Sequence, residues 1–263
     1  MIHSIEHPAV ELHDLTVTYN KKPVLWDIDL TLPKGAIIGI IGPNGAGKST
    51  MIKSIMGLIP LSSGYVKIFD QDLDEVRSQV SYVPQRESVD WDFPASVMDV
   101  VLMGRYSKLG LFKRPRKADK EMALECLRRV DMEPYINRQI SQLSGGQQQR
   151  VFLARALAQE ADLYFMDEPF AGVDAATETA IVQLMKTMSE QGKTVVVVHH
   201  DLQSAMEYFD WVVLLNLRLV ANGPVDQVMT TPLLQETYGG KLTLLAEVGE
   251  LLTRKEFPSR EDQ

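Results

Sequence analysis

The stretch "GPNGAGKST", residues 42–50, decides the fold. It follows the apolar run "AIIGII", residues 36–41, and opens a segment with a helical pattern. Glycines at such a strand-to-helix turn let backbone N–H groups close around nucleotide phosphates. Lys48 supplies a positive charge, and the Ser49 hydroxyl is a ligand for Mg²⁺. This context favours a phosphate-binding P-loop over an ordinary glycine turn.

The surrounding pattern predicts two β layers. "LYFM" (residues 163–166) and "TVVVV" (residues 194–198) are apolar runs rich in branched residues, so together with residues 36–41 they predict a parallel core sheet buried on both faces. "VELHDLTVTY" (residues 10–19) and "VLWDIDLTL" (residues 24–32) alternate apolar with polar residues and are joined by the turn "NKKP". They predict an antiparallel layer at the N-terminus.

Helical patterns cover residues 49–56, 118–130 and 177–190. Residues 88–142 contain no convincing strand, and we interpret them as a helical subdomain inserted between core strands. The segment after Lys241 holds an apolar patch and then becomes charged. We expect that last piece to be frayed.

Two carboxylates follow the run at residues 163–166. Asp167 lies on the sheet edge where α/β proteins bind ligands and is predicted to be the second Mg²⁺ anchor. Glu168 leaves the strand in another direction and is predicted to face the water that attacks the γ-phosphate. An acidic pair at a strand exit is common, and its combination with the P-loop makes the catalytic interpretation specific.

Four further polar or aromatic side chains each have two possible interpretations, one functional and one structural. His199 and His200 end a core strand on the same edge, where one of them can bind the γ-phosphate or the attacking water, or be a satisfied strand-end histidine. Periodicity does not choose between the two histidines. Gln85, in "SYVPQ", is an amide at a strand exit or a plain loop residue. Tyr19 precedes a turn, where its ring can stack on a base or pack against the β layer.

"LSGGQQQR", residues 143–150, predicts a second anion site. Ser144 can cap a helix whose third residue is Gln147, and the glycines at 145 and 146 expose backbone N–H groups at the helix start. The P-loop already binds phosphate, so this second site has no ligand of its own within the chain.

Composition limits the possible functions. The chain has 263 residues, 45% hydrophobic content and a formal charge of −8, which argues against a protein that wraps nucleic acid. The single Cys126 cannot form an internal disulfide and is expected to be a buried, inert thiol in a reducing compartment. The first residues lack the features of a secretion signal, and no apolar run approaches the roughly 20 residues that span a bilayer, so we expect a soluble, cytosolic chain.

Together these motifs closely resemble the ATP-binding subunit of an ATP-binding cassette (ABC) transporter, over roughly residues 10–240, and we predict a single ATP-binding domain at residues 10–242. Six motifs occur in the family's order: "GPNGAGKST" as Walker A, "YVPQ" as the Q-loop, "LSGGQQQR" as the signature, "LYFMDEP" as Walker B, "AGVD" as the D-loop and "HHDL" as the switch. The signature is the most specific of them. The resemblance implies an α/β fold of the P-loop NTPase class, with a mixed, largely parallel core sheet, an N-terminal antiparallel β layer, an α-helical subdomain inserted at about residues 88–158, and a C-terminal tail at residues 243–263.

The resemblance also implies roles for individual residues. Glu168 and His200 are implied to be catalytic, and Ser49, Gln85 and Asp167 are implied to hold Mg²⁺. Two cassettes, expected to be identical copies, are implied to stack head to tail, with Asp174 crossing the dimer. The signature residues Ser144, Gly145, Gly146 and Gln147 of one copy then cover the γ-phosphate bound by the other copy. ATP is implied to be bound by Tyr19, Gly42, Pro43, Asn44, Gly45, Ala46, Gly47, Lys48, Ser49 and Thr50.

Residues 89–114 together with "VVHHDL" look like the branch of bacterial importers that takes up manganese, zinc or ferrous iron, with manganese as first choice. That branch implies a separate integral membrane permease, an extracytoplasmic metal-binding protein, and a place at the cytoplasmic face of the membrane. We predict that Trp91 and Phe93 form an exposed aromatic pocket for a permease helix; the alternative is that they pack the helical subdomain.

Two rival functions differ in class. A soluble ABC-type ATPase acting on nucleic acid or ribosomes usually carries tandem cassettes or a long coiled coil, and filter binding to nucleic acid would reveal it. A small-molecule kinase would leave the signature and D-loop without purpose. His3, His7 and His13 fit no common metal-site spacing well, and we expect them to lie in a solvated leader.

Overall fold

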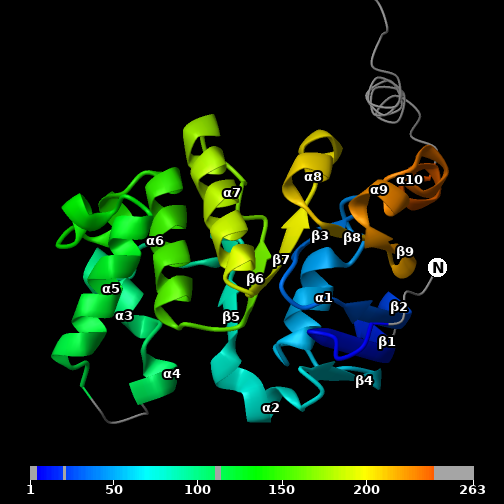
Figure 1. Ribbon diagram of the computed structural model, residues 1–263, viewed down its shortest axis with the longest axis horizontal. Helices are drawn as coiled ribbons and strands as arrows, with labels where there is room; N and C mark the ends of the chain where they lie inside the picture. Colours follow the sequence, from blue (N-terminus) through cyan, green and yellow to red (C-terminus); the bar gives the residue numbers. More distant parts are fainter. Residues whose placement is uncertain (1–4, 20–21, 110–113, 240–263) are drawn as a thin grey trace, which may run out of the picture.

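The computed structural model describes residues 5–19, 22–109 and 114–239 (Figure 1). Its strands form a six-stranded sheet and a three-stranded sheet. The six-stranded sheet contains, in spatial order, β5 (Val80–Val83), β6 (Leu163–Asp167), β7 (Thr194–His199), β3 (Ile37–Ile41), β8 (Trp211–Asn216) and β9 (Arg218–Pro224).

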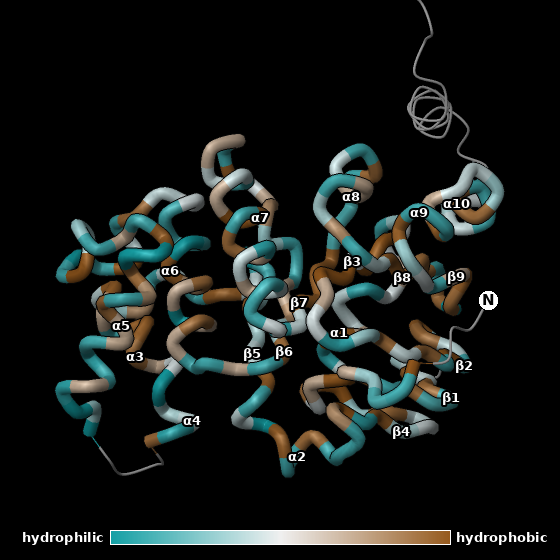
Figure 2. Tube along the Cα trace, in the orientation of Figure 1, coloured by the Kyte–Doolittle hydropathy of each residue, from teal (hydrophilic) through white to brown (hydrophobic). Residues whose placement is uncertain are grey.

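The centre of the larger sheet confirms the predicted parallel core. Strand β7 pairs in parallel with both β3 and β6, and every residue of these three strands is buried. Figure 2 shows β3 as a hydrophobic segment in the middle of the molecule. The sequence analysis did not identify β8 and β9, which form an antiparallel hairpin at one edge and make the sheet mixed. Because β3, β6 and β7 are parallel, their carboxyl ends lie at one edge of the sheet.

The smaller sheet confirms the predicted antiparallel N-terminal layer. Strand β1 (Val10–Tyr19) pairs with β2 (Lys22–Leu32) and with a third strand that the sequence did not predict, β4 (Ser63–Ile68). Alternate residues of β1 and β2 pack against the face of the larger sheet in one buried cluster. The predicted turn between the two strands lies partly outside the described residues.

The predicted helices occur within two residues of their expected ends, as α1 (Lys48–Ile55), α5 (Lys117–Arg129) and α7 (Ala175–Glu190). Among the described residues, no helix has both the length and the apolar character needed to cross a bilayer. Four further helices follow the strands of the two sheets: α2 (Leu73–Val76), α8 (Leu202–Tyr208), α9 (Val225–Val228) and α10 (Thr231–Tyr238).

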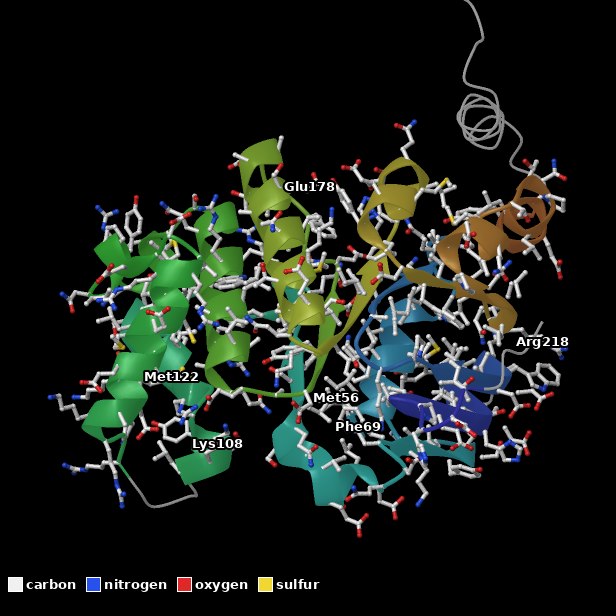
Figure 3. The ribbon with its side chains drawn as sticks, viewed as in Figure 1. Met56, Phe69, Lys108, Met122, Glu178 and Arg218 are labelled. Atoms are coloured by element: carbon white, nitrogen blue, oxygen red, sulfur yellow. The ribbon has the colours of Figure 1, made fainter. Side chains whose placement is uncertain are left out.

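A cluster of helices projects on the opposite side of the larger sheet from the N-terminal layer (Figure 1). Its members are α3 (Val97–Met103), α4 (Tyr106–Leu109), α5 and α6 (Gly145–Ala158). The side chains of Arg105 and Lys108, the latter labelled in Figure 3, both bind Glu160 just after α6 and fasten the helices together. Described residues of the 88–142 segment form no strand, only a single bridge between Ser96 and Gln139. The domain limits at 10–242 and the insertion at 88–158 stay predictions, and the predicted tail at 243–263 lies outside the described residues.

Candidate active site

The P-loop occupies the turn from β3 into α1. A Cβ atom on Gly42 would lie 2.0 Å from the Leu215 carbonyl oxygen, and one on Gly47 would lie 2.6 Å from a Leu25 methyl group. Gly47 also has φ +96°, which disfavours other residues. These contacts fix the loop around a cavity of about 410 Å³, lined by residues 44–50 together with Gln85 and Glu168.

Lys48 is only 6% exposed and lies inside this loop. Its ammonium group donates to the carbonyl oxygens of Gly42 (2.8 Å) and Pro43 (3.0 Å). Burial lowers the pKa of Lys48, while the nearby carboxylates of Glu168 and Asp167 act in the opposite direction. The loop therefore keeps a cation close to the place where phosphate oxygens would bind.

Asp167, at the end of β6, meets Ser49 of α1. The Ser49 hydroxyl donates to Asp167 Oδ1 at 2.8 Å, and the Tyr82 hydroxyl donates to Oδ2 at 3.5 Å. Asp167 is fully buried, and this burial raises its pKa despite the Ser49 bond. A hydroxyl and a carboxylate meeting beside a phosphate loop are hard oxygen donors, which fit Mg²⁺. Tyr82 was missed by the sequence analysis, although it belongs to the "SYVPQ" stretch.

Glu168 points to a different partner. Its backbone has φ +52°, an uncommon value for a residue other than glycine, so the chain turns sharply directly after β6. The Gln85 side-chain amide donates to Glu168 Oε2 at 3.1 Å. The two adjacent carboxylates therefore have different partners: Asp167 faces Ser49, and Glu168 lines the cavity with Gln85.

The two histidines after β7 have different environments. His199 is 3% exposed, binds the Ser204 hydroxyl through Nε2 at 2.8 Å, and packs edge-on against Phe170. Burial lowers the pKa of His199 to about 4, so it is a neutral, structural side chain at physiological pH. His200 is exposed, which suits the switch position that the family resemblance assigns to it.

The signature stretch opens α6 with the predicted capping box. Ser144 Oγ accepts from the Gln147 backbone N–H (3.4 Å), and Gln147 Oε1 accepts from the Ser144 backbone N–H (3.0 Å). Asp174 caps α7 by accepting from the Thr177 backbone N–H at 2.8 Å, and one of its oxygens would lie 4.0 Å from a Cβ on Gly146. The signature and D-loop are therefore neighbours within one chain, while the signature does not line the P-loop cavity.

A family model described as "ABC transporter" matches residues 25–171, more than half of the chain. The chain belongs to the ABC transporter family. The alternative function, a soluble ABC-type ATPase that acts on nucleic acid or ribosomes, is not favoured by the relatives of the chain.

Two relatives cover almost the whole chain. The manganese transport system ATP-binding protein MntB of Bacillus subtilis (strain 168) is 64% identical over 238 residues, 90% of this chain and 95% of that protein. The zinc transport system ATP-binding protein TroB of Treponema pallidum (strain Nichols) is 59% identical over 235 residues, 89% of this chain and 88% of that protein. The chain is thus an ABC-type ATPase, the ATP-binding subunit of a transport system.

Solved structures confirm the predicted fold class. The cbiO1 subunit from Clostridium perfringens, part of an ABC transporter complex, aligns with a TM-score of 0.73 at 25% identity over 94% of this chain and all of that one. A dimeric ATP-binding cassette in a post-hydrolysis state, bound to ADP and Pi, aligns with a TM-score of 0.71 at 31% identity over 82% of this chain and 98% of that one.

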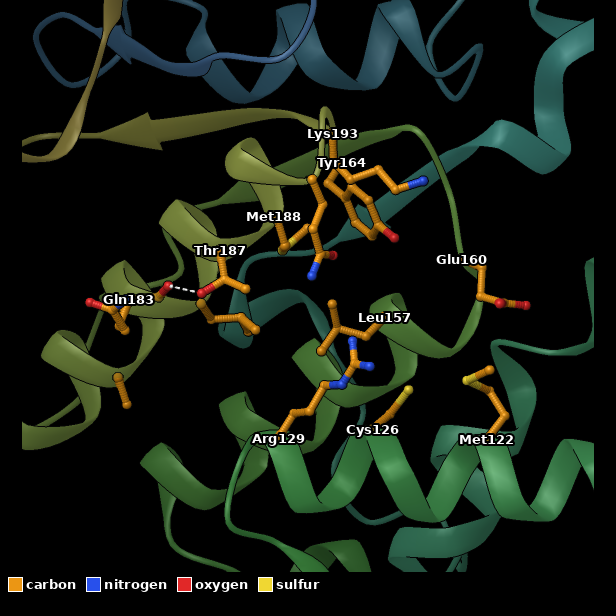
Figure 4. A pocket seen from close by; sticks show the side chains of 13 residues that line it. Met122, Cys126, Arg129, Leu157, Glu160, Tyr164, Gln183, Thr187, Met188 and Lys193 are labelled. Atoms are coloured by element: carbon orange, nitrogen blue, oxygen red, sulfur yellow. Dashed lines mark hydrogen bonds between the residues drawn. The ribbon is translucent and has the colours of Figure 1, made fainter.

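Other cavities of the cassette lie away from the motifs. One of them, about 660 Å³, lies between α5 and α7 and is lined by residues such as Cys126, Arg129 and Met188 (Figure 4). None of the predicted site residues lines it. Tyr19, at the end of β1, is 47% exposed and also lies outside the lining of the P-loop cavity.

Proposed function

We propose that this chain is the ATP-hydrolysing subunit of a bacterial ABC importer, which couples ATP binding and hydrolysis to the uptake of a divalent metal ion. The observation that carries the cargo is the 64% identity, over 90% of the chain, to a protein named for manganese transport. The relative named for zinc, at 59% identity, supports zinc as the next choice. Iron follows only from the resemblance of residues 89–114.

The nucleotide site supports the ATPase part of this proposal. Ser49 and Asp167 would hold Mg²⁺, because their hydroxyl and carboxylate oxygens meet beside the P-loop. Gln85, which lines the same cavity as Ser49, would add an amide oxygen. When bound, the ion offsets negative charge on the phosphate oxygens. Lys48 adds a second positive charge from within the loop, and the Tyr19 ring stacks on the adenine.

Glu168 orients the attacking water and accepts its proton. Its carboxylate lines the cavity, and among the described residues Gln85 is the hydrogen-bond partner of Oε2, which leaves Oε1 for water. His200 contacts the γ-phosphate from the neighbouring strand end. This division of work is supported by the burial of His199, whose nitrogen already binds Ser204.

A second, identical copy completes each site. The N-terminal amides of α6 form an anion site that the P-loop of the same chain does not use, because Ser144, Gly145, Gly146 and Gln147 lie outside its cavity. The solved cassette with ADP and Pi is dimeric, which supports the same arrangement here. Closure of the two copies around ATP would move an attached permease, and hydrolysis would release it.

The permease is proposed to dock beside the Q-loop. Phe93 is 53% exposed at a cavity of about 260 Å³ that also includes Val89 and Met103. Trp91 lines the same cavity but is less exposed than expected. It is half-buried, packs against Phe152 with ring centroids 4.9 Å apart, and donates to the Arg86 carbonyl oxygen at 2.9 Å.

These two aromatic residues give a matched pair of variants. Phe93→Ala should weaken binding to the permease at least about fivefold while leaving thermal stability unchanged, because its ring is exposed. Trp91→Ala should lower the stability of the isolated cassette. Binding is measured between the cassette and its permease in detergent, and unchanged binding of the Phe93 variant would exclude this docking surface.

The cargo is tested in cells that lack this subunit. Intracellular manganese, zinc and iron are measured by mass spectrometry, with the wild-type chain or Glu168→Gln supplied in trans. Loss of manganese accumulation, restored only by the wild-type chain, supports manganese import; loss of zinc or iron alone would assign that cargo instead. Unchanged levels of all three metals would reject the proposal. The chain is expected at the cytoplasmic face of the membrane, with an extracytoplasmic metal-binding protein delivering the ion to the permease.

A further inference from the structure

Strand β1 contains an extra residue opposite β2. Leu12 pairs with Leu30 and Leu15 pairs with Ile28, so two residues of β1 face the single residue Asp29. The pairing of β1 with β4 shifts at the same place. This is a β-bulge, a device that re-aims side chains locally.

The bulge turns two consecutive side chains to the same face. Leu12 and Leu15 are both buried, whereas His13 and Asp14 are exposed on the outer face beside Asp29. Asp14 adopts φ +48°, which a regular strand would not allow. Without the extra residue, His13 and Asp14 would point to opposite faces of the sheet.

Three potential metal ligands therefore converge. His13 Nδ1 lies 2.8 Å from Asp29 Oδ1, and His13 Nε2 lies 3.4 Å from Asp14 Oδ2. One ligand atom from each residue lies within 4.8 Å of the others. Two ligands of one zinc ion at about 2.1 Å lie at most about 4.2 Å apart, so small side-chain rotations on paired strands bring these three into range.

The composition of this cluster selects the kind of cation. An imidazole nitrogen with two carboxylates suits zinc and similar first-row divalent ions, whereas Mg²⁺ prefers oxygen ligands and keeps its waters. The three side chains are about half exposed, at 51%, 58% and 46%, which leaves positions for water and a path for the ion. Nearby Lys67 does not neutralise the site, because its ammonium group pairs with Asp72 at 3.0 Å.

We propose that His13, Asp14 and Asp29 bind one first-row divalent cation of the zinc class on the outer face of the N-terminal β layer. The site is separate from the Ser49–Asp167 pair and does not depend on the proposed cargo. It also corrects the expectation that His13 belongs to a solvated leader, because His13 lies within β1. A bound cation would link β1 to β2 in the folded state only, so it stabilises the fold.

The chain offers a matched control for this site. His7 pairs with Asp70 at 3.1 Å, with side chains 80% and 49% exposed, which is one histidine and one carboxylate on the same surface layer. Among the described residues no third metal ligand joins that pair. If any surface His–Asp pair bound zinc, substitution of either His7 or His13 would weaken zinc binding. If the three-residue site binds zinc, only substitution of His13 would weaken it.

The test uses the full, nucleotide-free chain in millimolar Mg²⁺, titrated with Zn²⁺ against a chromophoric chelator. We expect one zinc ion per chain, not displaced by Mg²⁺, and a rise in the thermal midpoint on binding. His13→Gln and Asp29→Asn should each weaken binding at least about tenfold, and His7→Gln should leave it unchanged. Without metal, His13→Gln and Asp29→Asn should lower the midpoint only slightly, because the side chains are about half exposed and asparagine keeps the Oδ1 that accepts from the Asp14 backbone N–H.

Three results would overturn the proposal. Equal zinc affinity in His13→Gln and the wild-type chain removes the histidine from the site. An equal loss in His7→Gln shows only general surface binding. Displacement of the zinc by millimolar Mg²⁺ shows an unselective acidic surface instead of a site with an imidazole ligand.

Discussion

At the scale of single residues, neighbouring groups of the same type differ because their surroundings differ. Asp167 is fully buried against Ser49, while Glu168 turns out of the strand at φ +52° and meets Gln85 at the cavity. His199 and His200 show the same contrast between a buried, bonded side chain and an exposed one. Burial and local backbone geometry, more than residue type, therefore decide which group is available for chemistry.

Glu168→Gln is expected to bind ATP and dimerise but to hydrolyse it about 10² to 10⁴ times more slowly, because an amide cannot accept the proton of water. The substitution keeps the size of the side chain and an oxygen that can accept the hydrogen bond from Gln85, so the fold should be unchanged. Phosphate release and ATP binding are measured on the same sample. Near-normal hydrolysis would remove Glu168 from its proposed role.

Cys126 gives a prediction about pH. The thiol is 2% exposed, and burial raises its pKa to about 11. The thiolate is the reactive form, so alkylation by iodoacetamide at pH 8 should be at least about a hundredfold slower in the folded chain than in denaturant. This is the only cysteine of the chain, so mass spectrometry reads it directly.

The raised pKa of Cys126 also predicts how the stability of the fold changes with pH. Because the folded pKa lies above the unfolded value of about 8.5, the neutral thiol stabilises the fold fully below that pH. This contribution is lost as the pH rises from there towards about 11. A Cys126→Ala variant should lose this part of the alkaline decline in denaturant midpoint; an unchanged decline would contradict the assignment.

At the scale of elements, short-range patterns were readable from the sequence and long-range pairing was not. The P-loop turn, the three buried parallel strands and the main helices follow from apolar runs and periodicity. Strand β4 is mostly exposed and depends on a partner distant in sequence, and β9 contains Asn222 and Gly223, which weaken a strand signal. The contact of Tyr82 with Asp167 requires the β5–β6 register, which no local pattern encodes.

The bulge in β1 shows the same limit in a smaller form. The spacing of Leu12 and Leu15, with two polar residues between them, was a visible break in the alternation. The position of Asp29 opposite that break depends on pairing with β2. The sequence analysis described residues 10–19 as a regular alternation and did not identify the bulge, and only the tertiary structure shows what it brings together.

A substitution at the start of helix α6 can distinguish a structural role of the signature from a functional one. A Cβ on Gly146 would lie 3.5 Å from its nearest neighbour, an ordinary contact, and alanine favours helix over glycine by up to about 1 kcal/mol. Gly146→Ala should therefore keep or slightly raise the thermal stability of the isolated chain and keep ATP binding. It should strongly reduce hydrolysis, because the added methyl group lies on the surface that must close over the partner's nucleotide. Full hydrolysis in this variant would contradict the proposal that this surface closes over the partner's nucleotide.

At the scale of the whole molecule, the P-loop and the signature of one chain do not meet. The P-loop cavity is lined by residues 44–50, Gln85 and Glu168, and the signature opens a different helix outside that lining. In the proposed dimer, two-fold symmetry would bring the P-loop of each copy to the signature of the other copy. The proposed unit of hydrolysis is then the dimer.

Mixing two inactive variants tests this arrangement. Lys48→Ala disables the P-loop, Gly146→Asp disables the signature, and a dimer of either variant alone has no intact site. Random pairing makes half of the dimers mixed, and each mixed dimer has one intact site, in which the P-loop of the Gly146 variant meets the signature of the Lys48 variant. The mixture should therefore recover up to about a quarter of wild-type phosphate release, at a level that rises with total protein concentration. Absence of any recovery, with mixed dimers confirmed by differential tagging, would contradict sites shared between two chains.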